Sequence, residues 1–172
     1  MALRKSRAHW LQEKFAGLLL DVETEVARHY GERLVSLIVF GSVGRSTPRM
    51  DSDLDMLIVA DPLQRGRIKR VGEFKAVKDA LGNRLRSLER DGIFTTLAPI
   101  FKTRSEVRQG SLLFLDMIDD GKILYDREDF WQTYLAQFRE RLRGLGARKI
   151  FQGDRWYWDL KPDYKPGEIF EI

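Results

Sequence analysis

Two short apolar segments joined by a glycine-rich loop constrain the fold of this chain more than any other feature of its sequence. Residues 34–40 read Leu-Val-Ser-Leu-Ile-Val-Phe, and a second apolar run extends from about Asp53 to Ala60. Short, nearly continuous apolar runs with many β-branched residues favour strands that are buried on both faces. The loop between them carries Gly41, Gly44 and Pro48, which predicts a loop or a loop that opens a short helix.

Helices and a further strand are predicted around these two strands. Apolar residues recur at spacings of three and four over Trp10–Tyr30 and again from about Ile68 to Arg90, where Gly82 weakens the second helix locally. Phe94–Phe101 reads as a third strand, and its proline favours an edge position because proline has no N–H to donate. The order helix, strand, strand, helix, strand predicts an α+β fold, a small mixed β-sheet with flanking helices.

The second half of the chain has a different character. We expect helical segments over residues 111–118 and from 129 to about 142, with a short extended piece at 123–125. This predicts a core of residues 1–104 and a C-terminal extension of residues 105–172 packed on it. The last part of the extension is rich in rings, and we expect an extended aromatic tail laid over the body, because so much aromatic area is seldom left in water. Its rings are those of Trp156, Tyr157, Trp158, Pro162, Tyr164, Pro166 and Phe170.

Composition narrows the chemistry available to the chain. Its 172 residues contain no cysteine and two histidines, which excludes disulfides, thiolate nucleophiles and cysteine-type zinc sites. Catalysis must therefore depend on carboxylates, hydroxyls and basic groups. No apolar run approaches the roughly 20 residues of a membrane span, and the basic N-terminus lacks the pattern of a secretory signal, so we expect a cytoplasmic protein. The net charge of +4 suits anionic ligands such as nucleotides.

The sequence Asp51-Ser52-Asp53-Leu54-Asp55 places two acids on one face of the second strand. Side chains alternate along a strand, so Asp53 and Asp55 point the same way, while Leu54 and Met56 point into the opposite layer. Two neighbouring carboxylates repel each other unless a cation lies between them. Oxygen ligands without histidine or cysteine nearby favour Mg²⁺ or Mn²⁺. The pair therefore predicts a metal site suited to phosphoryl or nucleotidyl transfer.

A phosphate-binding turn is predicted directly after the first strand. Gly41 lets the backbone approach a phosphate, Ser42 adds a hydroxyl, and Arg45 lies in the same loop with a guanidinium that matches phosphate oxygens. Each pattern alone has an ordinary explanation. Gly-Ser is common in turns, and the aspartates are also consistent with a loop of helix-capping acids or with a weak calcium-binding turn. The combination, with ten residues between Ser42 and Asp53 and both pairs beside apolar strands, makes coincidence a poor explanation.

These residues resemble the signature of the DNA polymerase beta-type nucleotidyltransferase superfamily, a Gly-Ser followed by a loop and an Asp-x-Asp on the next strand. The similarity is greatest to the minimal nucleotidyltransferases, including antitoxins that modify toxin partners, and it covers roughly the first 100 residues. The resemblance implies a mixed sheet, Asp53 and Asp55 as catalytic ligands of two Mg²⁺ ions, and Gly41, Ser42 and Arg45 at the triphosphate of an NTP, with ATP the expected one.

One departure from the family pattern bears on activity. The family usually places a third carboxylate on a later strand, whereas Phe94–Phe101 contains no acid, so Thr95 or Thr96 occupies the corresponding position. A neutral hydroxyl binds a divalent ion less well than a carboxylate does. The acids that can substitute from neighbouring segments are Asp91, Glu106 and Asp116.

Three functions remain open at this point. The first is an enzyme that moves a nucleoside monophosphate from an NTP onto an acceptor hydroxyl, where the acceptor is a small molecule, a protein or an RNA. The second is a catalytically weak or inactive regulatory or antitoxin-like protein that acts through a protein partner. The third is a nucleic-acid-binding module, suggested by basic helix faces that are more simply explained as solvated surfaces.

Overall fold

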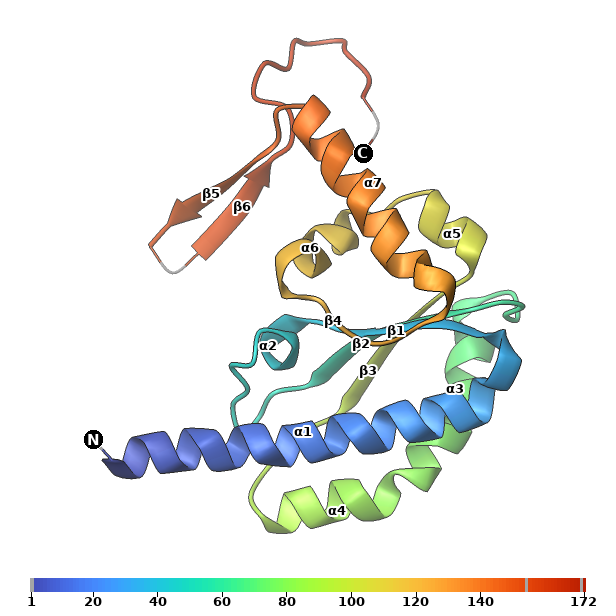
Figure 1. Cartoon of the computed structure of the whole chain (residues 1–172), viewed down its shortest axis with the longest axis vertical. Coiled ribbons are helices and arrows are strands. Elements are labelled where there is room, and N and C mark those ends of the chain that lie inside the picture. Colours follow the sequence, from blue (N-terminus) through green and yellow to red (C-terminus); the bar gives the residue numbers. More distant parts are fainter. Residues whose placement is uncertain (1, 154, 171) are drawn as a thin grey trace.

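The computed structural model describes residues 2–153, 155–170 and 172, and a four-stranded sheet forms the middle layer of the protein (Figure 1). Its strands are β1 (Leu34–Val39), β2 (Leu54–Ala60), β3 (Leu97–Lys102) and β4 (Lys122–Asp126). They lie in the order β3-β2-β1-β4, with β1 antiparallel to both of its neighbours and β2 parallel to β3. The predicted α+β fold with a small mixed sheet is confirmed.

The two central strands are buried on both faces, as their apolar sequences predict. All six residues of β1 are buried. Along β2 the side chains alternate between two apolar clusters: Leu54 and Met56 belong to one, and Leu57 and Val59 to the other. β3 begins at Leu97, three residues later than expected, and lies at the edge of the sheet, where its proline was predicted to place it.

Three helices cover one face of the sheet. They are α1 (Ala2–Tyr30), α3 (Arg67–Ala80) and α4 (Gly82–Arg90), with the short 3-10 turn η1 (Gly31–Arg33) leading into β1. The single helix expected from about 68 to 90 is wrong, because the chain divides into α3 and α4 at Leu81, next to the glycine that was expected only to weaken the helix locally. Neither α1, with its 29 residues, nor any other described helix combines the length and apolarity needed to cross a membrane.

The opposite face is covered by segments from the second half of the chain. They are α5 (Arg104–Arg108), η2 (Leu112–Asp116), α6 (Met117–Asp120), η3 (Arg127–Asp129) and α7 (Phe130–Gly144). Their apolar cluster is built around stacked and edge-on rings, and it packs against the sheet. β4 also comes from beyond residue 104, so the C-terminal part of the chain contributes a strand to the sheet. The buried rings are those of Phe114, Trp131, Tyr134 and Phe138.

The expected aromatic tail is in part a β-hairpin. β5 (Arg148–Gln152) pairs with β6 (Arg155–Asp159), and the hairpin projects from the C-terminal end of α7 (Figure 1). One face of the hairpin carries Lys149, whose ammonium lies 4.4 Å from the centre of the Trp156 ring, while Trp158 packs against the apolar cluster under α7. The tail is extended as expected, but its pairing into a hairpin was not predicted, because ring content indicates burial and says nothing about strand pairing.

An ion pair joins the two helical layers past the edge of β3. The guanidinium of Arg70 on α3 donates to both carboxylate oxygens of Glu106 on α5, at 2.7 and 2.9 Å. Glu106 also accepts from the backbone N–H of Thr103 in the capping box of α5. The hydrogen bonds from Arg70, offset in part by burial, lower the pKa of the Glu106 carboxyl below its ordinary value of 4.5.

We predict that Glu106→Gln lowers the free energy of unfolding by about 1 kcal/mol near neutral pH. Since the pKa of Glu106 is lower in the folded state, its contribution is present in full above the ordinary, unfolded pKa of 4.5 and is lost as the pH falls through the folded value. Urea denaturation at about pH 7 and about pH 3 measures this difference. Glu140→Gln is the matched control, because Glu140 pairs with Arg143 on an exposed face. A loss that stays the same at both pH values would contradict the prediction.

Candidate active site

The turn after β1 and the start of β2 lie side by side. α2 (Gly41–Gly44) begins directly after β1, and the backbone N–H of Phe40 donates to the carbonyl of Asp55 at 3.1 Å. Gly41 has φ +66°, in the left-handed region that favours glycine. A Cβ at this position would overlap the Asp55 carboxylate oxygen Oδ2 and lie 3.4 Å from its Cγ. The structure thus brings Gly41 and Asp55 into direct contact.

A buried serine fixes the hydroxyl of Ser42. The Ser42 Oγ donates to the Oγ of Ser52 at 2.9 Å, and Ser52 accepts in turn from the backbone N–H of Arg49 at the same distance. Ser52 is one of two buried polar residues among those described. This chain of hydrogen bonds holds the loop between β1 and β2 against α2.

The two aspartates influence each other electrostatically. Asp55 lies in β2 with its side chain directed away from the layer that contains Leu54 and Met56, as predicted, and Asp53 lies immediately before the strand. Burial first, and the negative charge of Asp53 second, raise the pKa of the Asp55 carboxyl, while Arg45 acts in the opposite direction. Asp53 is also held by Thr96: its Oδ1 accepts from the Thr96 hydroxyl at 2.5 Å and from the Thr96 backbone N–H at 3.3 Å.

Arg45 connects the loop to the C-terminal half of the chain. Its guanidinium lies 3.6 Å from a carboxylate oxygen of Asp120 at the end of α6. Its positive charge also opposes the rise in the pKa of Asp116, which is caused mainly by burial. Arg45 therefore stands between the aspartates of β2 and the acids of the η2 and α6 segment.

The described residues offer two carboxylates, not three, for a divalent cation. Among them no group of three or more histidine, cysteine, aspartate or glutamate side chains is arranged to hold a metal ion. Asp91 is paired with Lys14 at 2.7 Å and Glu106 with Arg70, so these acids serve other contacts. Two neighbouring carboxylates with hard oxygen atoms are groups that suit Mg²⁺ or Mn²⁺, and beside them the neutral hydroxyl of Thr96 donates a hydrogen bond to Asp53.

Sequence reasoning missed three residues that shape this site. Ser52 lies between Asp51 and Asp53. Because neighbouring side chains in an extended segment point to opposite sides, this position could have indicated that the Ser52 hydroxyl faces inward. Asp120 gave no signal, because its contact with Arg45 depends on how α6 packs. Ala98, the register partner of Asp55 on β3, is a small residue whose neighbour can only be known once the strands are paired.

The chain belongs to the nucleotidyltransferase domain family, whose model matches residues 19–109, more than half of its length. The matched range includes the Gly-Ser turn, both aspartates and the whole of β3. This confirms the resemblance to the polymerase beta-type superfamily, and the chain is a nucleotidyltransferase.

Among known proteins the chain is similar to a Methanocaldococcus jannaschii protein named "Putative protein adenylyltransferase MJ1305". The two are 29% identical over 153 residues, which is 87% of this chain and 97% of the relative.

Looser likenesses exist to solved toxin–antitoxin structures. One is described as a toxin–antitoxin with AMP-PNP (17% identity, TM-score 0.45, 72% of this chain and 92% of that chain). Another is a tri-AMPylated Shewanella oneidensis HEPN toxin in complex with MNT antitoxin (16% identity, TM-score 0.45, 73% and 87%). TM-scores of this size mark a loose similarity of backbone path, from which no activity follows.

We predict that Gly41→Ala reduces nucleotidyl transfer about a hundredfold, because the added methyl group displaces the Asp55 carboxylate. The left-handed backbone adds a cost of roughly 1–2 kcal/mol in stability. Transfer of label from an NTP labelled at the α-phosphorus and the melting temperature report the two effects separately. Gly144→Ala in α7 is the control, since a Cβ there meets nothing within 4 Å. Full activity in the Gly41 variant would show that the contact with Asp55 is dispensable.

Proposed function

We propose that this nucleotidyltransferase transfers AMP from ATP to a hydroxyl group of a protein, with Mg²⁺ held by Asp53 and Asp55. The observation that carries the proposal is the contact between Gly41 and the Asp55 carboxylate, because it unites a phosphate-binding turn with a cation-binding pair. The choice of ATP and of a protein acceptor is supported by the name of the relative, which shares 29% identity over most of both chains.

In this proposal the turn after β1 binds the triphosphate. The first N–H groups of a helix have no acceptor inside the helix, so those of α2 are available to phosphate oxygens. The hydroxyl of Ser42, oriented by Ser52, adds a further polar contact. Arg45 supplies a positive charge that stabilises the charge developing on the phosphates, and it exchanges its contact with Asp120 for one with the nucleotide.

The aspartate pair holds the cation on the other side of the turn. Burial raises the pKa of Asp55 and the negative charge of Asp53 adds to the rise; a divalent cation held by the two carboxylates would relieve this repulsion. Mg²⁺ held by Asp53 and Asp55 would neutralise part of the charge on the phosphates. The hydroxyl of Thr96 orients Asp53 through its hydrogen bond to Oδ1.

The transfer itself is an in-line displacement. The acceptor oxygen forms a bond to the α-phosphorus of ATP as the bond from that phosphorus to the bridging oxygen breaks, and pyrophosphate leaves. The proton of the acceptor hydroxyl passes to a carboxylate oxygen of Asp53. The residues of the chain thus position the reactants and balance charge, without a covalent enzyme intermediate.

We predict that Asp53→Asn combined with Asp55→Asn abolishes label transfer from ATP labelled at the α-phosphorus, because two amides replace both anionic ligands. Folding should be retained, since the exchange removes a repulsion between like charges. The assay follows nuclease-resistant label on protein in the presence of Mg²⁺. Asp51→Asn is the matched control, because Asp51 lies in the same loop with an exposed carboxylate. Undiminished transfer in the double variant would remove these residues from the mechanism.

A second candidate function is regulatory, with the chain binding nucleotide but acting mainly through contact with a protein partner. The observation that favours it is the neutral hydroxyl of Thr96 against Asp53, in the region where the family usually has a third carboxylate. Fewer anionic ligands weaken cation binding and slow catalysis.

Calorimetry of ATP binding, run together with a turnover assay, distinguishes the two candidates. The enzyme predicts binding that depends on Mg²⁺ and is followed by release of pyrophosphate once an acceptor is present. The regulatory protein predicts binding with no turnover on any acceptor. We expect Thr96→Asp to tighten binding of Mg²⁺ by adding an acid beside Asp53. Unchanged binding in this variant would mean that position 96 does not contribute to the cation site.

A further inference from the structure

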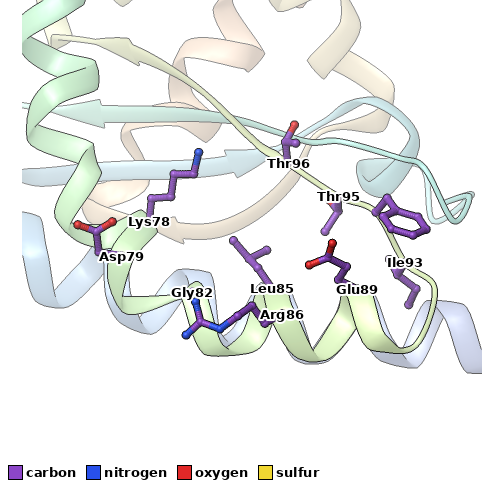
Figure 2. A pocket seen from close by; sticks show the side chains of 10 residues that line it. Lys78, Asp79, Gly82, Leu85, Arg86, Glu89, Ile93, Thr95 and Thr96 are labelled. Carbon is purple, nitrogen blue, oxygen red and sulfur yellow. The ribbon is translucent and has the colours of Figure 1, made fainter.

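A cavity runs along the free edge of β3, close to the proposed reaction centre. It has a volume of about 720 Å³ and lies between β3 and α3, with Asp55 on its wall. A second cavity of about 540 Å³ continues it toward α4 and reaches Thr95 and Thr96 (Figure 2). Lys78 and Asp79 line both cavities, which therefore adjoin.

The order of the strands determines what this cavity can receive. The phosphate-binding turn follows β1, the aspartates lie on β2, and the cavity lies beside β3, on the other side of the aspartates. In an in-line displacement the entering oxygen and the leaving pyrophosphate lie on opposite sides of the α-phosphorus. If the pyrophosphate lies at α2, the acceptor must enter from the side of β3. This step rests on the proposed function.

A small residue leaves the approach to Asp55 open. Asp55 is paired in register with Ala98, so only a methyl group separates the carboxylate from the edge of the sheet on that face. Thr96, which contacts Asp53, lies immediately before the same strand. In Figure 2 the side chains of Thr95 and Thr96 point to opposite sides of the chain, and Lys78 extends from its helix toward the strand.

The cavity carries an excess of positive charge. Its basic residues are Arg67, Lys75 and Lys78, all on α3. Lys75 is paired with Asp79 at 2.7 Å, so those two charges largely cancel. Neither Arg67 nor Lys78 makes an ion pair with any residue that the structure describes. Two cations are thus directed at a space that also contains the half-exposed Val71 and the apolar residues of β3, which suits a segment with both acidic and apolar side chains.

The backbone of β3 offers few hydrogen bonds at this edge. The carbonyl of Thr96 accepts from Leu54 on β2, so the alternate residues Leu97, Pro99 and Phe101 direct their polar groups outward. Pro99 has no N–H, and the carbonyl of Phe101 already accepts from Arg70 at 3.2 Å. A full additional strand is therefore not favoured, and a bound segment must be recognised mainly through its side chains.

We propose that the cavity between α3 and the edge of β3 is the acceptor site, and that it binds an acidic, extended segment of a protein whose hydroxyl is presented to Asp53 and Asp55. Arg67 and Lys78 select this segment by pairing with its carboxylates. RNA also carries negative charge, but the apolar part of the wall matches aliphatic and aromatic side chains better than a ribose-phosphate chain.

The test uses short synthetic peptides with one central tyrosine or serine, flanked by glutamates, by uncharged residues or by lysines. The protein is incubated with Mg²⁺ and ATP labelled at the α-phosphorus, and transfer to each peptide is measured. A single-stranded RNA with a free 3′ hydroxyl is included as the competing acceptor. We expect the acidic peptides to be labelled about tenfold more efficiently than the basic ones, with the preference falling as salt is raised.

The variants are Arg67→Glu combined with Lys78→Glu, and Lys69→Glu as the matched control. Lys69 lies on α3 with an exposed side chain but does not line the cavity. The double variant should label acidic peptides about tenfold less than the unmodified protein and should bind ATP with Mg²⁺ normally, while the control retains both properties. Binding of a fluorescent acidic peptide, measured by anisotropy, should weaken in the same variant and reports on the site without turnover.

Four outcomes separate this inference from the proposed function. The expected charge preference, lost in the double variant alone, supports the inference. Equal labelling of all peptides, or an unaffected double variant, overturns the inference and leaves the transferase activity in place. Label on RNA and on no peptide overturns both the inference and the protein acceptor. The absence of transfer to any acceptor, together with binding of ATP, overturns the proposed function itself.

Discussion

The antiparallel pairing of β1 with β2 is the constraint on which the rest of the site depends. It places the residues that follow β1 next to those that begin β2, and the hydrogen bond from Phe40 to the carbonyl of Asp55 marks the meeting point. At that point the backbone of Gly41 lies against the Asp55 carboxylate, in space that no side chain can share. The site exists because two buried strands are held in register by apolar packing on both faces, and the polar residues at their ends have no freedom to separate.

The second half of the chain completes the site as well as the core. β4 adds a strand to the sheet beside β1. The side chain of Asp55 points to the same face of the sheet as Leu57 and Val59, and beyond Asp55 this face is covered by the aromatic cluster of α7. Arg45 contacts Asp120, so α6 forms a wall beside the loop that joins β1 and β2. The opposite wall is the edge of β3 with α3. The site is therefore open toward the edge strand and closed toward β4, and this difference underlies our proposal that the nucleotide and the acceptor bind on different sides.

Much of this arrangement could be predicted from local patterns. The β-branched runs indicated β1 and β2, and Pro99 indicated an edge strand because a central strand needs the N–H that proline lacks. The division of the predicted helix near Leu81 was not predicted, since Leu81 is buried in the core and the break depends on packing rather than on propensity. The β5–β6 hairpin was missed for a related reason. The rings of Trp156 and Trp158 indicate that this segment packs against other residues, but the pairing of β6 with β5 is known only from the strand register.

Local sequence patterns were enough to predict the Gly41-Ser42 turn, the alternation that directs Asp53 and Asp55 to one face, and the lack of an acid on the third strand. These are properties of neighbouring residues, governed by backbone geometry that is the same in every strand and turn. Three other features became known from the packing of the chain: Thr96 contacts Asp53 across 43 residues of sequence, Arg45 contacts Asp120, and a basic cavity opens beside Asp55. Such contacts depend on how whole elements pack, and no local pattern encodes the distance between side chains brought together by a sheet.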